Sequence, residues 1–168
     1  MDSIYDFTIP VFIKMLSGLK GVLKKAAAHG GDEQAILNDR IASDMFPLLR
    51  QVQVATDNAK GAAARLSGQE IPKYEDTEKT FAELDARIDK TIAFLHTVTK
   101  ESFSNAATVQ VTLPYFPGKF MTGYDYACEY AIPNFFFHVA MAYALVRKNG
   151  VEIGKSDYMN NSMPFQDL

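Results

Sequence analysis

Apolar residues recur with the spacing of an α-helix in the first three long segments of the chain. The first segment follows Thr8, whose hydroxyl can cap a helix, and ends at His29-Gly30-Gly31, where glycine suits a left-handed cap. The second follows an N-terminal signal at Ser43-Asp44 and ends at Ser67-Gly68. The third begins with the capping-box sequence Thr80-Phe81-Ala82-Glu83. We therefore predict three amphipathic helices.

The apolar period changes from helical to two between residues 107 and 122. Polar residues alternate with Val109, Val111 and Leu113, and the segment 114–118 supplies a turn. The alternation predicts a small β-hairpin. So few strands cannot fold alone, and we expect them to lie across the helices.

A fourth helix is predicted from Thr122 or Gly123 to Asn149-Gly150, and it is apolar on nearly every side. Within its apolar run 130–146, the polar residues Asn134 and His138 are four residues apart and share one face. We expect both to be buried and to need partners. Pro133 should kink the helix, because it has no N–H group.

These elements predict an all-α fold, an up-and-down four-helix bundle with a small β-hairpin inserted before the last helix. A length of 168 residues suits a single domain, here 1–168, with the tail 151–168 extended and then mobile. A helix that is apolar nearly all round is either central or shared between chains. A homodimer is the expectation.

Composition and charge exclude several classes of function. The chain is 48% hydrophobic and 22% charged, which indicates a globular protein. A net charge of -3 argues against nucleic-acid binding, which needs clustered basic residues. Asn134 and His138 interrupt the apolar run 130–146, so we interpret it as a core helix and expect no membrane span.

The cysteine count and the N-terminal sequence predict a cytoplasmic location. Cys128 is the single cysteine, so an intrachain disulfide is excluded, which suits a reducing compartment. The segment 1–6 carries two acids and no positive charge, unlike a secretory signal.

Three motifs resemble a bacterial DinB-like domain family of uncharacterised function: Ile9-Pro10-Val11-Phe12, the sequence from Asp44 to Gln53, and Pro133-Asn134-Phe135-Phe136-Phe137-His138. The resemblance covers nearly the whole chain. It implies a four-helix bundle, often dimeric, from a superfamily in which many members hold a divalent metal with three histidines. Related members include thiol-dependent transferases, isomerases and metal-dependent hydrolases.

The same resemblance implies where a site would lie. The superfamily takes one ligand from the second helix and two from a His-x-x-x-His pair in the last, which here reads Asn134-x-x-x-His138. The second-helix position aligns with Gln53, and Asp57 follows one turn later, although helical geometry turns Asp57 away from the inner stripe. Two amides and one imidazole suit zinc or nickel poorly. We expect a degenerate metal site without a resident cofactor.

Three interpretations of this site stay open. The side chains either satisfy one another and the carbonyl freed by Pro133, or line a metal-free pocket for a small molecule, or hold zinc or nickel weakly. Two classes of function follow. One is a dimeric ligand-binding or structural protein. The other is a thiol-dependent transferase or metal-assisted hydrolase that uses His138 as ligand or general base.

Overall fold

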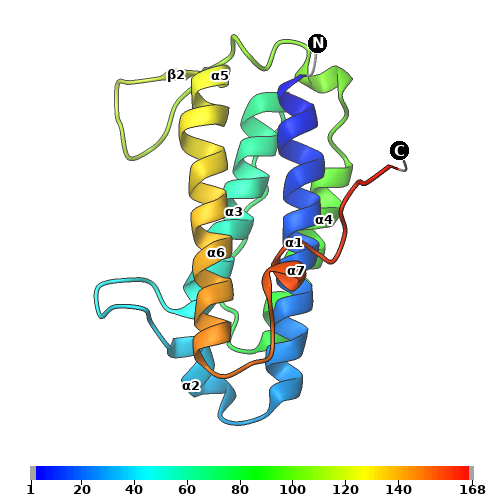
Figure 1. Cartoon of the computed structure of the whole chain (residues 1–168). Coiled ribbons are helices and arrows are strands. Elements are labelled where there is room, and N and C mark those ends of the chain that lie inside the picture. Colours follow the sequence, from blue (N-terminus) through cyan, green and yellow to red (C-terminus); the bar gives the residue numbers. More distant parts are fainter. Residues whose placement is uncertain (1–2, 167–168) are drawn as a thin grey trace.

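The computed structural model describes residues 3–166 and has four long helical segments side by side (Figure 1). They are α1 (Ile4–His29), α3 (Leu48–Ser67), α4 (Phe81–His96) and a continuous segment of α5 (Gly123–Asp125), the π-helix η2 (Tyr126–Ala131) and α6 (Ile132–Lys148). The shorter elements are α2 (Glu33–Asn38), the 3-10 helix η1 (Glu101–Phe103), β1 (Gln110–Val111), β2 (Met121–Thr122) and α7 (Lys155–Tyr158). The predicted helical bundle is confirmed.

Helix α1 begins earlier than we predicted. Ser3, rather than Thr8, is the N-cap, and its N–H donates to the Asp6 carboxylate over 2.8 Å. Thr8 is buried inside the helix and donates its hydroxyl to the Ile4 carbonyl over 2.6 Å. The Ser-x-x-Asp sequence therefore defines the start, and Pro10 lies in the helix interior.

The predicted C-cap of α3 and the predicted N-cap of α4 are present, because they depend on local sequence alone. Gly68 ends α3 in the left-handed conformation, with φ 75°. Thr80 accepts from the Glu83 N–H over 3.2 Å at the start of α4. The predicted helix start at Ser43-Asp44 was wrong, because the N-cap of α3 is Pro47. Residues 39–47, which we call the 39–47 arm, form a projecting loop (Figure 1).

The predicted hairpin is confirmed, but its ladder is short. β1 and β2 are antiparallel and pair Gln110 with Thr122 and Val111 with Met121. Residues 112–120 between them, the hairpin arm, project to the same side of the bundle as the 39–47 arm (Figure 1). Gly123 follows directly, and a Cβ there would lie 1.8 Å from the Ala106 carbonyl oxygen. Only glycine permits this approach.

A π-helical turn lies directly before Pro133, where we predicted a kink. Pro133 cannot donate to the Glu129 carbonyl, and the preceding turn widens, so that the Ile132 N–H donates to the Ala127 carbonyl. After this turn, α6 packs mainly against α3, while α1 packs against α4 and α6. Phe135 of α6 meets Phe12 of α1 with ring centroids 4.4 Å apart, and both are fully buried.

The tail contains one short helix, α7, where we predicted an extended chain. α7 packs on α1 at Gly18, where an added Cβ would lie 2.7 Å from the Tyr158 carbonyl oxygen. The last two residues of the predicted mobile tail, and the first two of the N-terminal segment, lie outside the described residues. Between residues 3 and 166, no helix is both long and apolar enough to cross a membrane.

Candidate functional site

His138 lies on α6 and faces Gln51 of α3. The imidazole Nδ1 is 2.7 Å from the Gln51 side-chain oxygen, and only 7% of the residue is exposed. The Gln51 side-chain nitrogen donates to the Phe46 carbonyl over 3.0 Å. One amide therefore joins the imidazole of the last helix to the end of the 39–47 arm.

These two contacts fix where the imidazole carries its proton. The Phe46 carbonyl can only accept, so the NH₂ end of Gln51 must face it, and the amide oxygen must face His138. That oxygen also can only accept, so Nδ1 of His138 carries a hydrogen. In the neutral ring Nε2 is then unprotonated and has a lone pair to offer.

Burial keeps this ring neutral. Desolvation lowers the pKa of His138 below its usual value of 6.5, and the positive charge of Arg50 lowers it further. At pH 7 the imidazole is therefore uncharged, with Nε2 as a hydrogen-bond acceptor or base.

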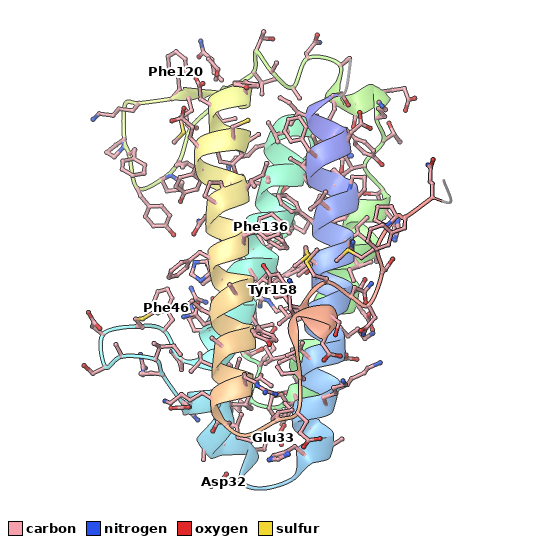
Figure 2. The ribbon with its side chains drawn as sticks, viewed as in Figure 1. Asp32, Glu33, Phe46, Phe120, Phe136 and Tyr158 are labelled. Carbon is pink, nitrogen blue, oxygen red and sulfur yellow. The ribbon has the colours of Figure 1, made fainter. Side chains whose placement is uncertain are left out.

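Two aromatic rings flank the imidazole. Phe46 stacks with His138 at a centroid distance of 6.4 Å, and Phe137 meets it edge-on at 5.2 Å. Both phenylalanines are 49% exposed. Figure 2 shows Phe46 on the projecting arm beside α6. The Arg50 guanidinium carbon lies 5.9 Å from the centre of the Phe46 ring. The site is thus a polar nitrogen between half-exposed aromatic groups.

Asn134 does not pair with His138. It donates to the Asn58 side-chain oxygen on α3 over 2.9 Å, while the Asn58 side-chain nitrogen is buried with no partner among the described residues. The interpretation that Asn134, His138 and Gln53 satisfy one another was therefore wrong. Asn134 and His138 instead bond two separate side chains of α3, because α3 is the helix against which α6 packs.

Gln53 and Asp57 do not contact His138, because Gln53 bonds Glu78 of the connection before α4 and Asp57 pairs with Arg87 of α4. Gln53 accepts from Arg50 over 3.1 Å and donates to Glu78 over 2.8 Å. Asp57 contacts Lys60 and Arg87 at 2.8 Å and 2.7 Å. Two residues of helix correspond to more than half a turn, which explains why Gln51 rather than Gln53 meets His138.

The carboxylates near Gln53 surround a buried arginine. Arg87 is 3% exposed and makes ion pairs with Asp57, Asp76 and Glu78 at 2.7–3.1 Å. Its guanidinium also lies 5.4 Å from the centre of the Tyr74 ring. These contacts tie the connection between α3 and α4 to the bundle, and they give the carboxylates a partner other than a metal.

The donor set does not fit a zinc or nickel ion. Gln51, Ala55 and Asn58 lie on one face of α3 by helical spacing. Ala55 lies between Gln51, which contacts His138, and Asn58, which contacts Asn134, and its side chain has no atom that could bind a metal. His138 is the one imidazole there, and no group of three or more His, Cys, Asp or Glu side chains suited to a metal occurs within residues 3–166. Amides are poor ligands for these ions.

Sequence reasoning missed Gln51, Asn58, Phe46 and Arg50. Gln51 precedes the buried Ala55 and Ala59 by one and two turns, so the inner stripe of α3 could have indicated it. The positions of Phe46 and Arg50 depend on how the 39–47 arm folds back, for which the sequence carries no local signal.

Comparison with known proteins agrees with this fold. The family model described as a domain of unknown function, DUF1993, matches residues 4–159. The crystal structure of a DinB family member protein from Shewanella denitrificans, at 1.83 Å resolution, superposes with a TM-score of 0.93 and 45% sequence identity. The match covers 98% of this chain and 95% of that one. No curated protein matches the chain.

Proposed function

This chain belongs to the DUF1993 family and has a DinB-like fold, and on that premise we propose that it is a dimeric bundle that binds a small ligand through Nε2 of His138. The metal site of the superfamily is degenerate in this chain. The observation that carries the proposal is the contact of His138 with Gln51, which leaves the lone pair on the other ring nitrogen.

The surroundings of Nε2 define the class of ligand. A lone pair on a neutral ring recognises an O–H, N–H or S–H donor. The half-exposed rings of Phe46 and Phe137 favour a flat apolar group beside that donor. The expected ligand is therefore a small aromatic or apolar molecule with one hydrogen-bond donor. Because Phe46 stacks beside the imidazole, movement of the 39–47 arm would widen the access of such a ligand to His138.

An NMR titration of the histidine side chains tests ligand binding. The probes are phenol, aniline and thiophenol, each paired with its methylated analogue: anisole, N,N-dimethylaniline and thioanisole. We expect saturable shifts of the His138 resonances with at least one donor and none with its analogue. His138→Phe, which keeps a ring and removes both nitrogens, should abolish the difference. Equal responses to donor and analogue in every pair would overturn the proposal.

The homodimer is supported by the exposed side of α6. Pro133, Phe137, Ala140, Met141 and Ala144 follow helical spacing on a stripe that carries no charge and is exposed or half-buried. Such a stripe suits packing against a second helix. Light scattering at micromolar concentration should give twice the chain mass of 18.7 kDa, and a species of the single-chain mass alone would contradict this.

A thiol-dependent transferase is the second candidate, favoured by the same lone pair. A neutral Nε2 can take the proton of a bound thiol as a general base. Glutathione and 1-chloro-2,4-dinitrobenzene provide a test, because turnover that depends on His138 would favour the enzyme. Ligand binding alone predicts the uncatalysed rate.

The metal-assisted hydrolase is disfavoured by the donor set. Calorimetric titration of the untagged protein with zinc, nickel and manganese should show no binding at micromolar levels. Stoichiometric binding that His138→Ala abolishes would restore the metal version of the proposal.

A further inference from the structure

Most of the exposed large apolar side chains gather on the two arms and the helix between them. Among the described residues, only Met163 and Phe165 of the tail fall outside this surface. Its members are Ile41 and Phe46 on the 39–47 arm, Tyr115, Phe116 and Phe120 on the hairpin arm, and Tyr124 and Phe137 on α5 and α6. Figure 2 shows Phe46 and Phe120 on the same side of α6.

The size of this surface fits an interface between two copies. Its seven members are 45–81% exposed. A large side chain offers roughly 200 Å², so together they expose on the order of 800 Å² per copy, the area that a standard interface buries on each partner. Isolated apolar residues on a surface need no explanation, whereas seven large ones on the two arms and the helix between them indicate an interaction site.

The two arms lie at opposite ends of α6 and project to one side (Figure 1). In a twofold dimer each patch meets the same patch of its partner. A twofold axis that crosses the middle of α6 at right angles exchanges its ends, so the hairpin arm of one copy faces the 39–47 arm of the other.

The two arms are complementary in shape and charge. The hairpin arm and its strands form an open apolar pocket of about 180 Å³, lined by Val111, Leu113, Phe116, Lys119, Phe120 and Met121. The 39–47 arm presents Ile41, a side chain that such a pocket can take. Lys119 and Asp44 are both exposed, one on each arm, and neither forms an ion pair within residues 3–166. Opposite charges on facing arms favour this pairing.

We propose that in the homodimer the hairpin arm of each copy closes on the 39–47 arm of the other, with Ile41 in the pocket and Lys119 beside Asp44. The base of the 39–47 arm is held within its own copy, where Lys148 donates to the Asp39 carboxylate over 2.9 Å. Its tip, Ile41 to Asp44, is exposed.

The partner copy therefore completes the ligand site. The 39–47 arm carries Phe46, which stacks on His138, and closure by the partner orders this aromatic wall. Binding at His138 and dimerisation are then coupled, and each changes the affinity of the other by the same factor. This consequence rests on the proposed function, while the contact between the arms does not.

Charge reversal tests the contact between the arms. Lys119→Glu and Asp44→Lys each place like charges together, and each should raise the dimer dissociation constant about tenfold in sedimentation equilibrium. The double variant exchanges the charges and should restore dimerisation. Lys24→Glu makes the same charge change on α1, at an exposed position without an ion pair in the described part, and should leave the constant unchanged.

The outcomes separate this inference from the proposed function. A dimer that both single reversals leave intact, or a double variant as weak as the singles, would overturn the contact between the arms. A monomeric wild-type protein would overturn it as well. The titration with donor and methylated probes tests ligand binding in either case. If the charge-reversal variants behave as expected but the wild-type dimer shows no donor-selective binding, the ligand site alone is rejected. Thermal unfolding should be the same for all variants at a concentration where they are monomeric.

Discussion

Gln51 is the residue on which the chemistry of His138 depends. Its amide has one end on the Phe46 carbonyl and the other on the imidazole, so that the proton is directed to Nδ1. Without this amide, no neighbouring group would fix which of the two ring nitrogens carries the proton. Gln53, an equally buried amide two residues later, does not contact His138 and instead belongs to the Arg87 cluster through its hydrogen bond to Glu78.

Gln51→Ala should lower the free energy of unfolding by about 1–3 kcal/mol, because the His138 N–H and the Phe46 carbonyl lose their partner. Gln53→Ala is the matched control. It should also destabilise the protein, yet leave the imidazole proton on Nδ1. Chemical denaturation and side-chain NMR of both variants make the comparison, and an unchanged His138 tautomer in Gln51→Ala would contradict the assignment.

The lowered pKa of His138 predicts how stability depends on pH. Above its usual value of 6.5 the ring is neutral in both states, and the stabilisation is complete. As the pH falls below 6.5, the unfolded chain takes up the proton first, so stability is lost down to the lowered pKa of the folded state. His138→Gln should remove this slope. Carboxylates such as Asp39, whose pKa is lowered from its usual value of 3.8, change the stability only at a lower pH. Parallel curves for wild type and variant between pH 6.5 and 5 would refute this.

At the level of elements, the helix ends show what a single sequence can predict. The caps at Thr80 and Gly68 were predicted because the groups that form them lie within four residues of each other. The start of α1 was misplaced because Thr8 and Ser3 are both acceptable caps, and the carboxylate of Asp6 decides between them. The pairs between α3 and α6 could not be predicted, because a sequence does not state the register of two packed helices.

Gly123 sets the base of the hairpin arm. Gly123→Ala would force the chain away from the Ala106 carbonyl and should destabilise the protein by about 1–3 kcal/mol. Gly21→Ala, at a helical position with nothing within 4 Å, should stabilise it by about 0.5–1 kcal/mol. Thermal or chemical unfolding measures both. If Gly123→Ala and Gly21→Ala changed the stability equally, the contact with the Ala106 carbonyl would not be the reason for glycine at position 123.

For the whole molecule, the bundle and the two arms have separate roles in this account. The core and the Arg87 cluster hold the helices together, whereas the arms and the uncharged side of α6 face solvent, where we propose that a second copy binds. A dimer of this kind makes apparent stability depend on concentration. The thermal midpoint should rise with protein concentration for the wild type and stay constant for Lys119→Glu at the same dilute concentrations. A midpoint independent of concentration in both would count against the dimer.

The protonation state of Nε2 of His138 decides whether the proposed ligand site can form, and this state can be measured directly. The chain has three histidines, so a long-range ¹H–¹⁵N correlation spectrum of labelled protein at pH 7, assigned with His138→Gln, resolves the state of each ring. We predict that His138 is neutral, with the hydrogen on Nδ1 and a bare Nε2. A hydrogen on Nε2, or a charged ring at pH 7, would contradict the proposed ligand site.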